Sequence, residues 1–269
     1  MLSPDGRRLA VQGREGGFDI WVYDVERGSK GRFTFDKAGK TPWAWTPSGG
    51  EIAYASYRSG SVDIVSKPAS GNGEAKLLVG TPVDEMAPDW SPNQRFLIYE
   101  ASTRETKSQL LYRERLKDGT LGDPVVFLRS AFNEHAPRFS PDGRFVAYVS
   151  DESGSNEIYV RDFPNGGGEW QVSVKGGIAP RWRRDGGEMF YVQPGAGLMA
   201  VSVGTRPTFS PGTPKLLFGK RVLGAGYDVS ADGKRFIILD RPSDEPPLSI
   251  HVVHNWFEDF RGQQANAGK

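Results

Sequence analysis

The side chains best suited to acid–base or metal chemistry are few and far apart in this sequence. Its only histidines are His135, His251 and His254, and it has no cysteine. His251 and His254 stand three residues apart in a segment that we expect to be a strand. Their side chains should therefore point to opposite faces and not share a metal ion. The sequence predicts neither a metal site nor any other cofactor site.

Motifs that indicate catalysis are equally scarce. The serine-hydrolase sequence Gly-x-Ser-x-Gly does not occur, and neither does a glycine-rich phosphate loop followed by Lys and Ser or Thr. Arg161-Asp162-Phe163-Pro164 resembles the Asp-Phe-Gly metal motif of kinases, but Pro164 stands where Gly is required. We therefore predict that this chain is not an enzyme, while a catalytic domain could precede it in a longer protein.

The chain is organised by a repeated turn sequence. Ser3-Pro4-Asp5-Gly6 recurs as Ser140-Pro141-Asp142-Gly143, and looser copies stand at 46–49, 91–94, 184–187 and 231–234. Pro sets the first turn position, Asp caps the turn, and Gly takes the left-handed conformation that ends it. Because the Asp recurs in most units, we assign it to the turn and not to catalysis.

Apolar columns align around this turn when the position of Pro4 in each unit is numbered zero. Position −2 carries Trp45, Trp90, Phe139, Trp182 and Val229, and position +7 carries Val11, Tyr54, Tyr99, Tyr148, Tyr191 and Ile238. These columns predict two antiparallel strands joined by a hairpin, and two further strand-like segments follow in most units. The turns lie 43 to 49 residues apart, a period typical of propeller blades.

The predicted fold class is therefore all-β, a six-bladed β-propeller of four-stranded antiparallel blades. We expect one propeller domain over residues 1–257, with blades near 1–36, 37–81, 82–130, 131–175, 176–220 and 221–257, and a disordered C-terminal tail over 258–269. The first blade lacks its inner strand, because the first unit begins at its turn. We expect Met1 to be an internal start and the chain to be the C-terminal part of a longer protein.

Composition narrows the classes of partner. Lys plus Arg number 34 and Asp plus Glu 33, which gives a formal net charge of +1. Because basic and acidic residues are nearly equal in number, the charge gives no reason to expect nucleic acid or an anionic membrane as partner. No stretch approaches the roughly 18 apolar residues of a membrane helix, and the first residues lack the features of a signal peptide. Sequence alone leaves the localisation unknown.

One stretch carries a resemblance to a known family. Ala136-Pro137-Arg138-Phe139-Ser140-Pro141-Asp142-Gly143, followed by Asn156-Glu157-Ile158-Tyr159-Val160, closely resembles the TolB-like propeller repeat, a WD40-like repeat, and the likeness covers nearly the whole chain. The ending from Ile250 to Phe257 is similar to propellers attached to bacterial serine/threonine kinases. The resemblance implies a binding scaffold in a periplasmic or other extracytoplasmic protein.

Candidate recognition residues follow from this fold. In a propeller, the loops that lead into each inner strand share one face with the loops between the second and third strands, around the central channel. Loops on a rigid scaffold commonly carry binding residues. The candidate recognition face consists of Tyr57, Arg58, Asp84, Glu85, Arg104, Asn133, Glu134, His135 and Tyr227.

Charges also recur on the inner strands. Position −3 carries Asp89, Arg138, Arg181 and Asp228, next to the expected channel. Buried charges are costly unless they are paired, so we predict Asp89 beside Arg138 and Arg181 beside Asp228 on adjoining blades. We favour structural pairing over a ligand-binding channel lining, but the residues leave both open.

The predicted function is a non-catalytic propeller that binds a protein or peptide partner or senses a ligand, with a small ligand at the channel mouth also possible. It would form the C-terminal part of a larger protein such as a bacterial receptor serine/threonine kinase. The alternatives are a propeller-fold hydrolase or lyase with a site at the channel mouth, or the propeller of a peptidase without its catalytic domain.

Overall fold

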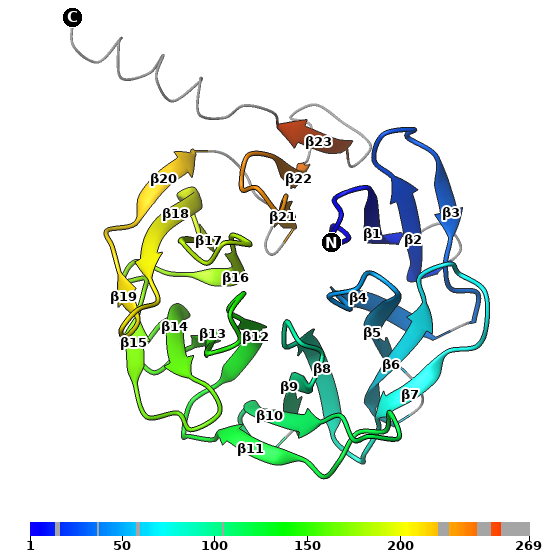
Figure 1. The fold of residues 1–269 in the computed structure, drawn as a ribbon, viewed down its shortest axis with the longest axis horizontal. Coiled ribbons are helices and arrows are strands. Elements are labelled where there is room, and N and C mark those ends of the chain that lie inside the picture. The colour runs from blue at the N-terminus through cyan, green and yellow to red at the C-terminus, as the bar shows by residue number, and fades with distance from the viewer. Residues whose placement is uncertain are drawn as a thin grey trace, which may run out of the picture.

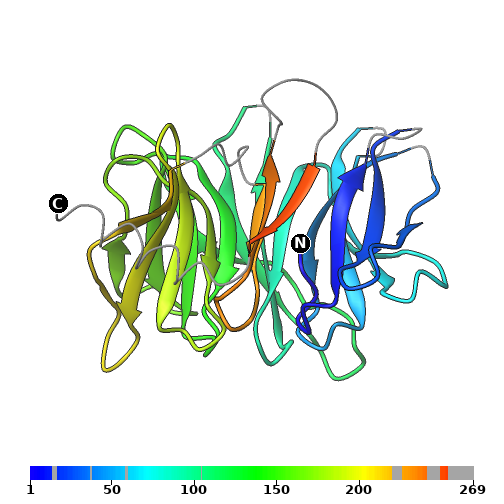
Figure 2. The ribbon, with the colours of Figure 1, turned by 90° about the horizontal axis from the view of Figure 1, so that it is seen from above.

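The computed structural model describes residues 1–13, 17–36, 38–57, 60–103, 105–219, 226–240 and 249–253. These residues form antiparallel sheets that follow one another around a ring, with the N-terminus near the centre (Figure 1). Seen from the side, the strands run between the two flat ends of the ring (Figure 2). The all-β propeller predicted from the repeat is confirmed.

The strands group into sheets in chain order. The first three sheets contain β1 (Arg8–Gly13), β2 (Asp19–Asp24) and β3 (Lys30–Arg32); β4 (Gly39–Trp45), β5 (Glu51–Tyr57), β6 (Val62–Pro68) and β7 (Lys76–Val79); and β8 (Asp84–Trp90), β9 (Phe96–Ser102), β10 (Gln109–Glu114) and β11 (Val125–Leu128). The other three contain β12 (Glu134–Phe139), β13 (Phe145–Ser150), β14 (Glu157–Asp162) and β15 (Glu169–Gln171); β16 (Ile178–Trp182), β17 (Glu188–Gln193), β18 (Gly197–Gly204), β19 (Ser210–Pro211) and β20 (Lys215–Phe218); and β21 (Tyr227–Val229), β22 (Phe236–Asp240) and β23 (Ser249–Val253).

The prediction of six uniform four-stranded blades is wrong in this detail. Among the described residues, the first and last sheets have three strands each, and the fifth has five because β18 pairs with both β19 and β20. In the first sheet only Met1 and Leu2 lie along the inner edge of β1, through backbone bonds between Met1 and Ala10 and a bridge between Leu2 and Leu9. The predicted tail, residues 258–269, lies outside the described residues.

The repeated turns have the predicted chemistry. Gly6, Gly143 and Gly186 have φ values of +70°, +72° and +75°, the left-handed region that glycine adopts without steric cost. In the fourth sheet, the Ser140 hydroxyl donates to Asp142 at 2.6 Å and accepts from the backbone N–H of Phe145 at 3.0 Å. The Asp side chains therefore stabilise the turns through hydrogen bonds within them.

The core consists of layers between neighbouring sheets. The +7 tyrosines Tyr54, Tyr99, Tyr148 and Tyr191 are all almost fully buried. Five apolar clusters of described residues each join one sheet to the next, from the first–second pair to the fifth–sixth pair. Each sheet is thus held by the face that it presents to its neighbour.

Trp90 tests this packing. It is buried between the second and third sheets with Ile64, Val79 and Tyr99. Trp90→Ala should lower the free energy of unfolding in urea by about 3–5 kcal/mol, because it removes a large buried side chain and leaves a cavity. Val174→Ala, at a side chain that is 73% exposed, is the control and should change it by less than about 0.5 kcal/mol. Equal small effects would place Trp90 outside the core.

Candidate functional site

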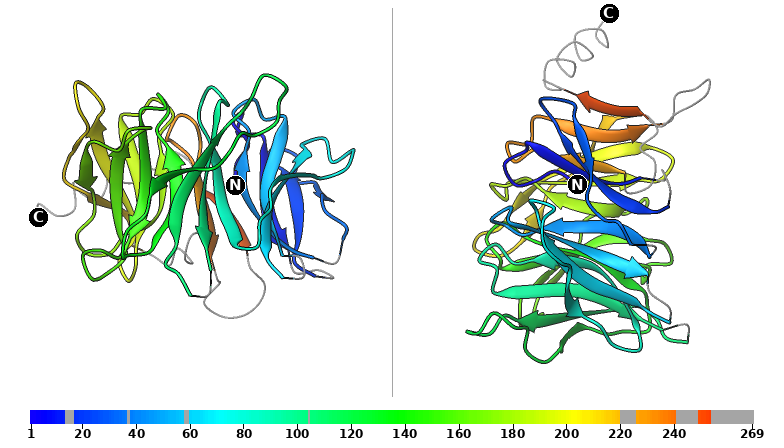
Figure 3. Two further views of the ribbon diagram at one scale, coloured as in Figure 1. Left: turned by 90° about the horizontal axis from the view of Figure 1, so that it is seen from below. Right: turned by 90° about the vertical axis from the view of Figure 1, so that its right-hand side faces the viewer.

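The channel has two different ends. The inner strands β4, β8, β12 and β16 begin at loops on one end, which we call the loop side, and finish at the Ser-Pro-Asp-Gly-like turns on the other, which we call the turn side. Figure 3 shows these connections projecting from both ends of the strands. The candidate recognition face belongs to the loop side, and the −3 charges lie closer to the turn side.

A bulge in three inner strands sets the direction of these charges. Ala87, Ala136 and Ala179 have φ values of 50°, 53° and 56°, and each precedes a proline. The pairing register shifts at the same places, as between His135 and Arg138 in β12. Such a bulge re-aims the side chains beyond it, and a non-glycine residue in this region is strained. Asp89, Arg138 and Arg181 follow these alanines by two residues, whereas the register of β21 around Asp228 is continuous.

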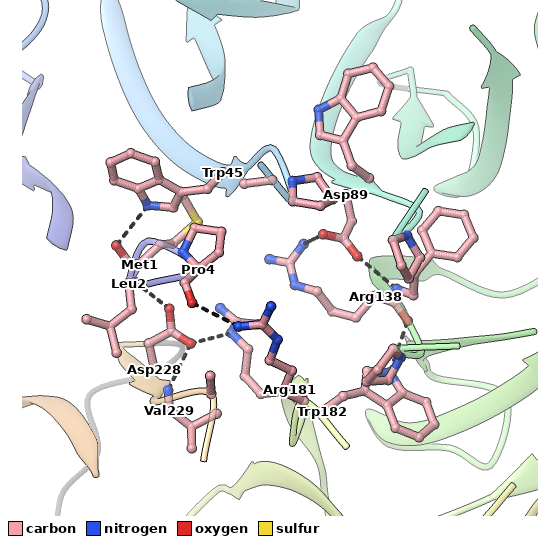
Figure 4. Close-up of a pocket in the computed structure, with 18 of the residues that line it drawn as sticks. Met1, Leu2, Pro4, Trp45, Asp89, Arg138, Arg181, Trp182, Asp228 and Val229 are labelled. Carbon is pink, nitrogen blue, oxygen red and sulfur yellow. Dashed lines mark hydrogen bonds and ion pairs between the residues drawn. The ribbon is translucent and has the colours of Figure 1, made fainter. Parts of the chain in front are cut away.

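The four predicted channel charges form the two predicted pairs (Figure 4). Arg138 lies 4.0 Å from Asp89, and Arg181 lies 3.5 Å from Asp228, each pair joining neighbouring sheets. Asp89 also accepts from the backbone N–H of Phe139 at 2.8 Å, and Asp228 accepts from that of Leu2 at 2.7 Å. The carboxylates therefore connect sheets as well as neutralise the guanidinium groups.

Burial shifts the titration of the first pair. It raises the pKa of Asp89, with Arg138 opposing the shift. Burial, together with the charge of Arg181, lowers the pKa of Arg138 to about 10, so this guanidinium stays charged at neutral pH. Arg138 reaches the carbonyl oxygens of Pro137 and Pro88 at 3.2 and 3.4 Å. These contacts support the structural interpretation of the pair.

Around these charges lies a pocket of about 530 Å³, which we call the turn-side pocket. Its wall includes the channel charges, the aromatic residues Trp45 and Trp182, and prolines of the turns. The exposed Arg184 at its rim donates to the carbonyl oxygen of Pro4 at 3.4 Å. The pocket has the volume of a small-molecule site, but its carboxylates are already bonded to protein groups.

A double-mutant cycle tests the Asp89–Arg138 pair. Arg138→Met should lower the free energy of unfolding by about 3–5 kcal/mol, because it leaves a buried carboxylate without its partner. Adding Asp89→Asn keeps the acceptor for Phe139 and should recover about 1 kcal/mol or more in urea denaturation. Strictly additive effects would show that the two side chains do not interact.

On the loop side, two predicted recognition residues are buried within their own loops. Glu85 accepts from the hydroxyl and the backbone N–H of Thr81, and Glu134 accepts from the hydroxyl of Ser130. Both side chains are almost fully buried. Burial raises the pKa of each carboxyl, with the hydrogen bonds opposing it. Both carboxylates therefore bond the connection that leads into their own strand.

The remaining candidates divide between structural and exposed positions. Asp84 accepts from the N–H of Val62 at 2.9 Å, and Asn133 donates to Asp151 through its backbone and side-chain amides. Tyr227 is buried and donates to the carbonyl of Ala179 at 2.8 Å. His135 is half-buried and Tyr57 is exposed.

Some sequence candidates cannot be located. Arg58, Arg104 and His254 lie outside the described residues, and of His251 only the backbone, in β23, is described.

Two other acidic residues were missed by the sequence analysis. Asp19 and Glu157 begin the third strands of their units and are buried against the hydroxyls of Thr34 and Ser173. Burial would raise the pKa of Asp19, but hydrogen bonds from Thr34 and Arg32 outweigh it and hold the pKa below its ordinary value. Their recurrence at the same strand position was the available signal.

Glu134 yields a pH test. Since its pKa is raised in the folded chain, the folded state binds this proton more tightly than the unfolded state, and stability falls as the pH rises through that pKa. Glu134→Gln keeps the shape without the charge. Its melting temperature should exceed that of the wild type at pH 7, and the difference should vanish below the ordinary Glu value of 4.5. A difference that grew at low pH would contradict this assignment.

The loop side also carries exposed apolar side chains, of which the sequence analysis singled out only Tyr57. Large apolar residues with 39% to 73% exposure lie in its loops and at its strand ends: Phe18, Phe35, Tyr57, Phe132 and Val174. Phe18 and Tyr57 flank one short segment, since the carbonyl of Phe18 accepts from Lys40 and Tyr57 pairs with Gly39. We call these five residues the loop-side apolar set.

Two classes of feature are not found where they can be assessed. Within the described part of the chain, no three His, Asp or Glu side chains are grouped so as to hold a metal ion. No helix there has the length and apolar character needed to cross a membrane.

Comparison with known proteins supports the resemblance to TolB. No protein-family model matches the chain. An uncharacterised protein of Agrobacterium fabrum, Atu1656, is 26% identical over 71% of this chain and 68% of its own length. The uncharacterised peptidase YuxL of Bacillus subtilis is 24% identical over 59% of this chain, and the TolB homolog of Chlorobium luteolum is 29% identical over 58%. The chain spans only 31% and 34% of these two relatives.

Solved structures show the same fold. TolB from Acinetobacter baumannii superposes with a TM-score of 0.73 over 94% of this chain and 62% of its own, at 17% identity. An oligogalacturonate lyase in complex with manganese superposes with a TM-score of 0.64 over 96% of this chain and 73% of its own, at 15% identity. The chain is thus a β-propeller that is similar to TolB proteins in sequence and in fold.

Proposed function

We propose that this chain is a non-catalytic recognition domain whose loop side binds a protein or peptide partner. In this proposal residues 1–257 form one six-bladed propeller, with the first and sixth sheets as its end blades. The observation that carries the proposal is the loop-side apolar set. Exposed apolar and aromatic side chains on loops held by a rigid scaffold are typical of protein-binding surfaces.

The polar surroundings of this set support binding and not catalysis. Glu85 and Glu134 are held by Thr81 and Ser130, and Asp19 is held by Thr34. Carboxylates engaged in this way order the loops. The buried Lys40 likewise pairs with Asp19 at 3.6 Å and with Asp36. The charged groups of these loops therefore pair with other groups of the loops, while the side chains of the loop-side apolar set are exposed to solvent.

The wider context is also a proposal. The similarity to proteins named TolB and Tol-Pal system protein TolB favours an extracytoplasmic location. The net charge of +1 gives no electrostatic basis for nucleic-acid binding. We propose that the chain is part of a larger extracytoplasmic protein, for example a receptor kinase. A small ligand in the turn-side pocket is compatible with this role.

A second candidate is the propeller of a peptidase, favoured by the similarity to YuxL. The coding sequence that flanks this chain separates the two. A Gly-x-Ser-x-Gly motif within a hydrolase domain there would favour the peptidase, whereas a kinase domain and a membrane helix would favour the receptor. An enzyme site in the channel itself is supported by likeness of fold alone, as to the oligogalacturonate lyase.

Selection of binding peptides tests the recognition proposal. Peptides chosen from a random dodecapeptide library on the folded protein should lose affinity by about tenfold or more in Phe132→Ser and Val174→Ser. Both side chains are exposed, so the variants should keep the wild-type melting temperature.

The matched control is Leu116→Ser, at an exposed apolar side chain of the turn side. It should leave the affinity of the selected peptides unchanged. Peptides that bind independently of Phe132 and Val174, or that depend on Leu116 or Arg184, would contradict a loop-side site.

A further inference from the structure

A second pocket on the turn side lies between the third and the fourth sheet. It has a volume of about 390 Å³ and is formed by the turn between β8 and β9, the start of β9, the turn between β12 and β13, and the connection between β14 and β15. Of the residues that line it, only Pro92 also lines the turn-side pocket of the channel. We call this cavity the intersheet pocket.

The floor of the intersheet pocket is aromatic and is held in place by packing. The ring of Phe163 makes T-shaped contacts with Phe96 and Phe139, with ring centroids 5.2 and 4.8 Å apart. These contacts fix the half-buried rings of Phe96 and Phe163, which line the pocket. The exposed prolines Pro92 and Pro164 form part of its wall. The pocket therefore offers a preformed surface of aromatic and proline rings to an apolar group.

The free polar side-chain groups at this pocket are hydrogen-bond donors. The side chain of Arg95 is 60% exposed, and its Nε donates to Glu114 at 2.7 Å. Its terminal nitrogens have no hydrogen-bond partner among the described residues. The side-chain oxygen of Asn93 accepts two bonds within its turn, which leaves its amide nitrogen as a second donor. The carboxylate of Asp142, in contrast, is already bonded within its own turn. The pocket therefore suits an occupant that supplies hydrogen-bond acceptors.

The boundary between the fourth and fifth sheets shows what such an arginine can hold. Arg144 and Phe145 stand three and four residues after their turn proline, and Arg95 and Phe96 hold the same two positions in the third sheet. Each guanidinium lies over the adjoining phenylalanine, with its carbon 5.1 and 5.0 Å from the ring centroid. A terminal nitrogen of Arg144 donates to the carbonyl oxygen of Thr205, in the connection between β18 and β19. An arginine at this turn position thus binds a peptide carbonyl within the molecule itself.

The two boundaries differ in what covers the arginine. Phe209, from the same connection as the bound carbonyl, packs against Phe145 with ring centroids 5.6 Å apart. Between the third and fourth sheets, Phe163 packs against Phe96 in the equivalent way, so the place of a large ring is already taken. No described backbone carbonyl there accepts a hydrogen bond from Arg95. An occupant of the intersheet pocket therefore has to bring a carbonyl group and a compact apolar group.

Proline meets both requirements. An extended proline-containing segment exposes its carbonyl oxygens, and each proline has a compact apolar ring and no N–H that would meet the donors of the pocket. The connection held by Arg144 itself contains a proline, Pro207. We propose that the intersheet pocket binds an extended proline-containing segment of a partner protein. Arg95 donates to a backbone carbonyl of this segment, and a proline ring packs against Phe96 and Phe163. This surface is separate from the loop-side apolar set, and the inference does not rest on the proposed function.

A hexaproline peptide tests the proposal. The probe is acetylated and amidated L-hexaproline, which adopts a left-handed extended helix. Its addition to the isotope-labelled protein should produce saturable shifts in the backbone amide NMR signals of Asn93, Arg95 and Gly143, with a Kd of about 1 mM or less. D-Hexaproline is the matched control, because it has the same composition and the opposite handedness. It should bind about tenfold more weakly.

Variants of the protein locate the binding. Arg95→Met keeps an apolar stem without the donors and should weaken binding of L-hexaproline about tenfold. Arg7→Met, at an exposed arginine with the same turn position in the first sheet, is the matched control and should leave the affinity unchanged. Asn93→Asp keeps the oxygen that the turn uses, removes the amide donor and should weaken binding about threefold or more. All three positions are exposed, so the melting temperature should stay within about 2 °C of the wild type.

The loop-side variant Phe132→Ser should bind L-hexaproline as the wild type does, so the proposed function and this inference can fail separately. Three outcomes would overturn the inference. The first is equal binding of the L and D peptides, which would mean that the pocket takes any apolar molecule. The second is an affinity that is the same in Arg95→Met and Arg7→Met. The third is the absence of saturable shifts around the pocket at about 5 mM peptide.

Discussion

Burial of each sheet face against the next sheet is the constraint on which the rest of this structure depends. A sheet of three or four strands has two faces, and an apolar face exposed to water costs free energy in proportion to its area. Here the cost is avoided by a ring in which aromatic residues such as Tyr99 and Tyr148 lie between neighbouring sheets. The free energy needed to open the ring locally should therefore be lowest where the contact between two sheets buries the least apolar surface.

The inner strands meet a second requirement, because the charged residues that they carry beside the channel are costly to bury unless they are paired. Asp89, Arg138, Arg181 and Asp228 occupy this zone and pair across sheet boundaries. Bulges at Ala87, Ala136 and Ala179 precede three of these residues, Asp89, Arg138 and Arg181. The strain of a non-glycine residue at positive φ is thus offset by contacts that connect the sheets. The pairing between neighbouring sheets that the sequence predicts for these charges is present in the structure.

The sequence predicted the features that repeat. The turn tetrapeptide, the apolar columns and the complementary charges at position −3 each recur, so several units support one inference. Glu85 and Glu134 show the limit of this approach. Their sequence positions predict recognition residues, because a sequence does not show that Thr81 and Ser130, four residues before them, donate hydrogen bonds to their carboxylates. Features that occur once, such as the extra strand β19 and the loop-side apolar set, have no periodic signal and emerge only in three dimensions.

Native-state hydrogen exchange tests the central claim most directly. If contacts between sheets determine stability, amides of β1 and β22, which no apolar cluster of described residues joins, should exchange through a partial opening. Its free energy should be about 2 kcal/mol or more below that of β9 and β13. Amides of β9 and β13, with clusters on both faces, should exchange only by global unfolding. Equal opening free energies around the whole ring would contradict the account.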